Sequence, residues 1–166
     1  MKRLILFRHG KAEHTSTSGK DFDRALTERG REDARLVAEA LARHGVVPDL
    51  VLVSEAARTQ ATWAAAQPAF PKPRVRVERA LYQADAKTLL QTAEREAGGS
   101  IMIVTHNPGV HELALQLAED AGDQALKAKL ELGFPTAAAA VIDFETDGLP
   151  AGGRMVLPSD LGGGKR

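Results

Sequence analysis

The sequence contains no cysteine. This absence excludes disulfide bonds, zinc–thiolate centres and cysteine nucleophiles, and it suits a reducing cytosol. An excess of either charge is also missing, because 22 Lys and Arg residues balance 22 Asp and Glu residues and the formal net charge is zero. A general nucleic-acid-binding protein is usually basic, so we expect no nucleic-acid partner.

Long apolar runs are missing as well. The run at residues 4–7 ends before Arg8, and it is too short for the core of a signal peptide, which needs about 7–15 apolar residues. Nothing elsewhere approaches the roughly 20 apolar residues of a membrane-spanning helix. We therefore expect a cytoplasmic protein with no membrane partner.

The remaining composition is that of an ordinary globular domain. The chain has 166 residues, of which 43% are hydrophobic and 27% charged, and this length can bury a substantial core. No internal repeat or linker divides it. We expect one domain over residues 1–160, followed by a disordered tail over residues 161–166.

Short continuous apolar runs indicate strands that are buried in a parallel sheet. These runs lie at residues 4–7, 50–53 and 101–104, and a shorter candidate lies at residues 75–77. Near the C-terminus, residues 137–144 and 155–157 flank Asp147 and Gly148. This arrangement predicts a terminal hairpin.

Helix signals lie between the strand signals. Thr27 is a candidate N-cap for a helix whose apolar residues between 34 and 41 share one face. Ser54 is a candidate N-cap for a helix over residues 55–66. Another helix is predicted over residues 86–97, closed by the glycines that follow.

A further helix start is predicted at Asn107 and Pro108, with the asparagine as N-cap and the proline at the first helical position. The polar segment at residues 13–24 predicts a mobile loop. Strands that alternate with helices predict an α/β fold. We expect a single domain with three α/β/α layers, a central, mostly parallel sheet and a C-terminal hairpin.

Basic and imidazole side chains follow the predicted strands. Arg8 and His9 come after the first strand, Ser54 and Arg58 after the second, and His106 after the third long apolar run. In such folds, ligands bind outside the carboxyl ends of the strands. A residue of this kind can serve the structure alone, but their convergence on one edge, without a carboxylate, predicts an anion site. Phosphate is the natural occupant.

Four segments resemble the signature blocks of the histidine phosphatase superfamily, which includes the cofactor-dependent phosphoglycerate mutases. Their order and spacing match over residues 3 to about 145. The short chain and the Thr-His-Asn-Pro form of the last block resemble the SixA-type phosphohistidine phosphatases. The four segments are FRHGK at residues 7–11, LTERG at 26–30, VSEAARTQAT at 53–62 and VTHNPG at 104–109.

The resemblance implies that His9 is the nucleophile that accepts the phosphoryl group. No metal or other cofactor is expected, because arginine and histidine side chains supply the charge that phosphoryl transfer requires. The candidate catalytic residues are His9, Arg8, Arg58 and His106. The candidate substrate-binding residues are Arg8, Arg24, Arg58, His106 and Asn107.

One position departs from the family pattern. Many members carry a glutamate that protonates the leaving group, where this sequence has Gln83. Other carboxylates nearby are expected to be solvated surface groups, so no general acid is assigned. These carboxylates are Glu13, Asp21, Asp23, Glu78 and Asp85.

The expected function is hydrolysis of a phosphoryl group through a phosphohistidine intermediate on His9. The leading substrate is phosphohistidine, and the partner would then be a phosphohistidine-bearing protein. An alternative is a phosphatase for small phosphate esters. A second alternative is a non-catalytic phosphate-binding signalling module, against which the intact His9 and His106 argue.

Overall fold

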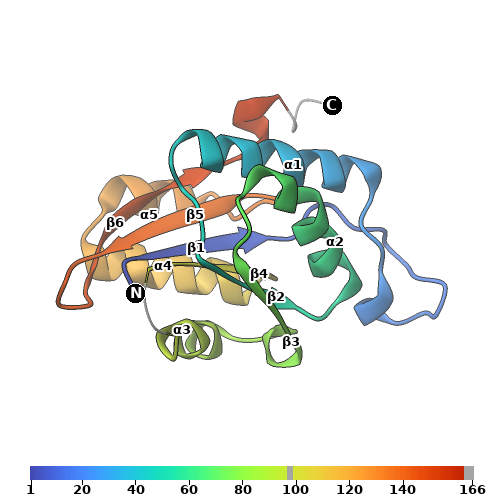
Figure 1. The fold of residues 1–166 in the computed structure, drawn as a ribbon, viewed down its shortest axis with the longest axis horizontal. Helices are drawn as coiled ribbons and strands as arrows, with labels where there is room; N and C mark the ends of the chain where they lie inside the picture. The colour runs from blue at the N-terminus through green and yellow to red at the C-terminus, as the bar shows by residue number, and fades with distance from the viewer. Residues whose placement is uncertain (97–98, 163–166) are drawn as a thin grey trace.

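The computed structural model describes residues 1–96 and 99–162 (Figure 1). Within them lies one six-stranded sheet with the order β3-β2-β4-β1-β5-β6. The first four strands run parallel, whereas β5 and β6 form the predicted antiparallel hairpin at one edge. The strands are β1 (Arg3–Arg8), β2 (Leu50–Ser54), β3 (Arg74–Glu78), β4 (Ser100–Thr105), β5 (Ala139–Phe144) and β6 (Pro150–Val156).

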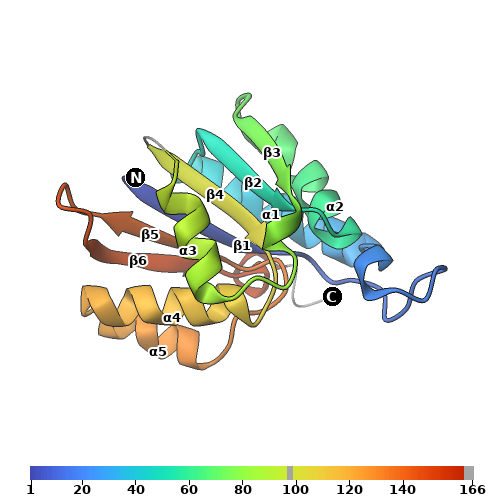
Figure 2. The same ribbon diagram turned by 90° about the horizontal axis from the view of Figure 1, so that it is seen from below.

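Helices cover both faces of the sheet, which confirms the three-layer α/β/α architecture (Figures 1 and 2). On one face lie α1 (Glu28–Arg43) and α2 (Ala57–Ala66). On the other face lie α3 (Ala86–Glu94), α4 (Gly109–Ala121) and α5 (Gln124–Glu131). Helix α5 was not predicted from the sequence.

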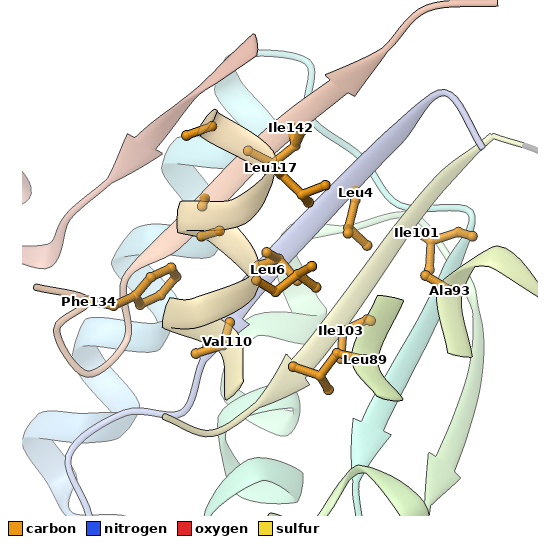
Figure 3. Packing of buried hydrophobic residues seen from close by; sticks show 14 of the residues in the cluster. Leu4, Leu6, Leu89, Ala93, Ile101, Ile103, Val110, Leu117, Phe134 and Ile142 are labelled. Carbon is orange, nitrogen blue, oxygen red and sulfur yellow. The ribbon is translucent and has the colours of Figure 1, made fainter. Parts of the chain in front are cut away.

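The core is divided by β1, whose side chains alternate between the two faces because successive residues of a strand point to opposite sides. Leu4 and Leu6 pack under α4, and Ile5 and Phe7 pack against α1 on the opposite side. All four side chains are fully buried. Figure 3 shows Leu4 and Leu6 near Leu117 in the first of these clusters. Burial on both faces explains why β1 reads as a continuous apolar run.

Helix α1 begins as predicted, but α2 and α4 do not. The Thr27 hydroxyl accepts a hydrogen bond from the Gly30 amide at 2.9 Å, so Thr27 is the N-cap of α1. The prediction that Ser54 caps α2 is wrong, because α2 has Ala56 at its N-cap position and no side-chain cap. The prediction that Asn107 caps α4 is also wrong. Pro108 is the N-cap there, and the Asn107 amide instead donates to the Phe134 carbonyl.

The polar segment at residues 13–24 is more ordered than a simple loop. It contains a short 3-10 helix, η1 (Asp21–Asp23), and a β-bridge between Ala12 and Leu26 closes it. Helix α3 ends at Glu94. The end of the predicted helix and its Gly98 stop fall on residues 97–98, outside the described residues.

The C-terminal hairpin is followed by a last 3-10 helix, η4 (Pro158–Leu161). Leu161, the first residue of the predicted tail, packs against the α1 side of the core. Residues 163–166 of that predicted tail lie outside the described residues. No helix of the described chain is both long and apolar enough to cross a membrane.

Candidate active site

The pocket lies where three neighbouring parallel strands end. In the sheet, Arg8 of β1 is in register with Thr105 of β4, and Val53 of β2 is in register with Val104. The carboxyl ends of β1, β4 and β2 therefore meet at one edge, beside a pocket of about 590 Å³. All six site residues that the sequence predicts line this pocket, namely Arg8, His9, Arg24, Arg58, His106 and Asn107.

His9 is held by its backbone and by its ring. Its amide donates to the Thr105 carbonyl at 3.1 Å, and its carbonyl accepts from the Ala137 amide at 2.9 Å. The ring Nδ1 lies 2.7 Å from the Gly10 carbonyl oxygen. Because a carbonyl only accepts, Nδ1 carries the proton, and Nε2 keeps its lone pair.

The surroundings of His9 keep its ring neutral. The side chain is only 6% exposed. Burial lowers the pKa of His9 to about 4, and the nearby Arg8, Arg58 and Arg24 guanidinium groups add to this effect. At pH 7 the imidazole is thus neutral and has a free Nε2 lone pair, which is what a nucleophile requires.

Two glycines allow the His9 loop to pack tightly. A Cβ atom at Gly10 would lie below 3.0 Å from the Gly30 carbonyl, and one at Gly30 would meet the Lys11 backbone just as closely. The Gly10 amide also donates to the Thr62 hydroxyl at 3.0 Å. The segment that begins α1 therefore supports the loop that carries the Gly10 carbonyl.

The buried Arg58 and the half-buried Arg8 contribute the positive charge. The Arg8 Nη1 donates to the Phe134 carbonyl at 2.8 Å, and Arg58 donates to the backbone and the carboxylate of Asp21 at 2.9 and 3.1 Å. The Nε atoms of both arginines are buried and have no partner among the described residues. Burial and the proximity of Arg58 lower the pKa of Arg8. The two positive groups repel each other, and an anion in the pocket would relieve this repulsion.

His106 lies beside His9, with ring centroids 5.4 Å apart. It is 5% exposed, and burial lowers its pKa to about 3, with Arg58 and His9 contributing. Its Nε2 is 2.7 Å from the Ser54 hydroxyl. Its Nδ1 is buried and has no hydrogen-bond partner in the described part of the chain. One ring nitrogen of His106 is thus left without a hydrogen bond within the described residues.

Asp21, predicted to be a solvated surface carboxylate, is exposed and also lines the pocket. It accepts hydrogen bonds from Tyr82 at 2.7 Å, from Arg24 at 2.9 Å and from Arg58 at 3.1 Å. The Tyr82 hydroxyl is the main cause that lowers the pKa of Asp21 to about 2, and the two arginines add to it. Asp21 is therefore ionised at neutral pH and orders the cationic groups rather than donating a proton.

Gln83 lines the same pocket with a backbone φ of 58°. Of the carboxylates in residues 1–96 and 99–162, Asp21 alone lines the pocket. Asp85 instead caps α3 through the Thr88 amide, and Glu78 pairs with Arg76. In the same described ranges, no group of three or more His, Asp or Glu side chains could hold a metal ion.

Comparisons with known proteins identify the family and the fold. The sequence profile of the Histidine phosphatase superfamily (branch 1) matches residues 4–86. The SixA crystal structure from Agrobacterium tumefaciens is 34% identical, with 94% of each chain covered and a TM-score of 0.76. The structure of the protein histidine phosphatase SixA complexed with tungstate is 25% identical, with 96% of this chain and 99% of that chain covered and a TM-score of 0.78.

A curated relative is an uncharacterized chloroplastic protein of Arabidopsis thaliana. It is 33% identical over an alignment of 130 positions, and the alignment covers 70% of this chain. The match covers 59% of that relative's own length.

Proposed function

The chain belongs to the histidine phosphatase superfamily, and on that premise we propose that it is a metal-independent phosphatase that acts on phosphohistidine. The observation that carries the proposal is the hydrogen bond from His9 Nδ1 to the Gly10 carbonyl. It leaves the Nε2 lone pair of His9 free in a pocket that Arg8 and Arg58 also line. These groups together suit transfer of a phosphoryl dianion to nitrogen.

The reaction has two steps. In the first, the Nε2 lone pair of His9 attacks phosphorus, and the bond from phosphorus to the substrate's imidazole nitrogen breaks. The leaving imidazole takes the bonding electron pair and keeps the proton on its other nitrogen or gains one from solvent. In the second, water attacks the phosphorus on His9, inorganic phosphate leaves, and Nε2 regains its lone pair. Arg8 and Arg58 stabilise the charge on the phosphoryl oxygens in both steps.

The choice of substrate follows from the proton donors of the pocket. Gln83 cannot donate as an acid, and Asp21 is ionised because its hydrogen bonds lower its pKa to about 2. An alkyl ester expels an alkoxide, for which a positioned acid contributes about 10²–10⁴-fold. Imidazole needs far less help, because its conjugate acid has a pKa of about 6.5. Without a carboxylic acid to protonate an alkoxide, the pocket favours a phosphoryl group bound to histidine.

The similarity to SixA structures supports the same substrate class, since one of them is named as a protein histidine phosphatase and binds tungstate. A protein-borne phosphohistidine would then be the physiological partner. We infer that the substrate reaches the pocket as an exposed side chain of that partner.

The test compares kcat/KM for a phosphohistidine peptide with kcat/KM for glycerate and hexose phosphates. We expect a preference of at least about a hundredfold for the peptide, the lower end of an absent acid's contribution. Comparable values would contradict the assignment and favour a phosphatase for small esters. The absence of any turnover, with phosphate still bound, would favour a non-catalytic module.

A further inference from the structure

Ser54 was predicted to cap a helix, but in the structure its hydroxyl contacts His106 instead. It ends β2, directly beside β4, from which the chain continues to His106. Its side chain is fully buried, and its hydroxyl lies 2.7 Å from His106 Nε2. A buried hydroxyl that is hydrogen-bonded to an imidazole at a candidate site can fix the position of the ring proton.

Whether the Ser54 hydroxyl donates or accepts depends on which ring nitrogen of His106 carries the proton. His106 lines the pocket, and Ser54 occupies its Nε2. A hydrogen bond from His106 to a bound phosphoryl group must therefore use Nδ1, which is buried and without a partner among the described residues. Phosphoryl oxygens that carry negative charge accept hydrogen bonds, so Nδ1 must carry a proton. In a neutral ring, Nε2 then bears the lone pair, and the Ser54 hydroxyl must be the donor.

We propose that Ser54 is a positioning residue, whose hydroxyl donates to Nε2 and keeps the proton of neutral His106 on Nδ1, the nitrogen that contacts the phosphoryl group. The proposal rests on the phosphatase function proposed above. Without this hydrogen bond, the opposite tautomer would point a lone pair at an anion. That arrangement is repulsive and leaves one fewer donor for the transition state.

The groups around His106 favour a neutral ring. A neutral ring has one N–H group, so the tautomer decides which of the two nitrogens can donate a hydrogen bond. Arg58 lies on α2, and Arg8 and His9 lie at the end of β1. All three lower the pKa of His106 and so disfavour protonation of its second nitrogen. The ionised Asp21 of η1 acts in the opposite sense, and the Tyr82 ring packs edge-on at 5.6 Å between centroids. If a bound dianion does protonate the ring, the Ser54 oxygen can accept from Nε2, and Nδ1 remains a donor.

The first test uses Ser54→Ala, with Thr59→Ala as the matched control. Thr59 is equally buried, but the hydrogen bonds that its hydroxyl makes within the described residues go to the Ser54 and Ala56 carbonyls. We expect Ser54→Ala to lower kcat/KM for the phosphohistidine peptide by about 10- to 100-fold, as for a hydrogen bond that serves a charged centre. Ser54→Thr, which restores a hydroxyl, should recover most of this loss, and Thr59→Ala should lose little.

Equal losses in Ser54→Ala and Thr59→Ala would overturn the proposal, because a local packing defect would then explain both. A failure of Ser54→Thr to recover any activity, while it folds normally, would also contradict it.

The second test reads the tautomer directly, without turnover. Nitrogen-15 spectra of the full chain with labelled histidine distinguish a protonated Nδ1 from a protonated Nε2, and His106→Gln identifies the signals by their loss. We expect a protonated Nδ1 on His106 in the wild-type protein at pH 7, and a mixture in Ser54→Ala. His9 provides an internal reference, because the Gly10 carbonyl fixes its proton on Nδ1.

A wild-type His106 with its proton on Nε2 would overturn the proposal, whatever the variants do. If the protein does not turn over the phosphohistidine peptide but His106 carries its proton on Nδ1, the proposed substrate is contradicted and the role of Ser54 stands. Tungstate affinity gives a further readout that needs no substrate, and we expect it to fall about tenfold in Ser54→Ala.

Discussion

The two pocket histidines make the stability of the folded chain depend on pH. Burial, reinforced by the pocket arginines, lowers the pKa of His9 to about 4 and that of His106 to about 3. In the unfolded chain both groups have a pKa of about 6.5. Since the folded pKa values are the lower ones, the unfolded state binds more protons below pH 6.5. Their contribution to stability is therefore present above pH 6.5 and is lost as the pH falls toward 4 and then 3.

The size of the effect follows from these values. At pH 5 each imidazole is almost fully protonated in the unfolded chain but mostly neutral in the folded protein. Relative to pH 8, this lowers the free energy of unfolding by about 2 kcal/mol per histidine, or about 4 kcal/mol for the pair. Such a loss is a large fraction of the roughly 5–15 kcal/mol that stabilises a typical domain.

Urea unfolding at pH 8 and at pH 5 measures this loss, with the double variant His9→Gln/His106→Gln as the comparison. We expect the wild-type protein to lose about 4 kcal/mol more than the double variant. Asp21 does not interfere, because hydrogen bonds lower its pKa to about 2 and its own contribution is lost only in more acidic solution. Equal losses in both proteins, or a wild-type loss below about 1 kcal/mol, would refute the electrostatic reasoning about the pocket.

Three further outcomes are expected. Arg58→Ala should lower kcat/KM by at least about a hundredfold, because it removes buried charged donors, whereas Arg35→Ala on the exposed face of α1 should leave it unchanged; equal effects would contradict the role of the pocket charge. Gln83→Glu should raise kcat/KM for alkyl phosphates at least about tenfold under mildly acidic conditions, since a protonated carboxyl could then serve the leaving oxygen; no gain would show that the residue does not reach the leaving group. Dialysis against EDTA should leave turnover unchanged while tungstate inhibits it, and a loss that Mg²⁺ restores would contradict the metal-free mechanism.

The parallel part of the sheet is predictable because its sequence signals are local and strong. β1, β2 and β4 are buried on both faces, so each reads as an unbroken apolar run. Helix α5 was not predicted because it is short and because its two buried residues, Leu126 and Leu130, form too weak an apolar pattern. Its N-cap, Asp123, is a turn residue that does not by itself identify a helix.

The edge of the sheet where the site lies is also predictable, because parallel strands present their carboxyl ends together. The hydrogen-bond partners of the side chains at that edge cannot be predicted from the sequence. Ser54 precedes a helix and looks like a cap, but its hydroxyl bonds to His106, 52 residues away in the chain. Asp21 lies in a polar segment typical of solvent-exposed loops, yet it pairs with Arg58 and Tyr82, which are 37 and 61 residues away. Such pairings depend on the tertiary fold, and no pattern in the neighbouring sequence indicates them.

The central claim is that Nε2 of His9 takes the phosphoryl group. Rapid quenching of the wild-type protein with a phosphohistidine peptide, followed by peptide mapping, tests it directly. We predict acid-labile, alkali-stable phosphate on His9, bound at Nε2 because the Gly10 carbonyl holds the proton on Nδ1. His9→Ala should trap none and keep less than about a hundredth of the wild-type rate, a loss of more than about 2.7 kcal/mol in transition-state stabilisation. Phosphate found on Nδ1 or on another residue, or a His9→Ala variant that still turns over at a substantial rate, would contradict this account.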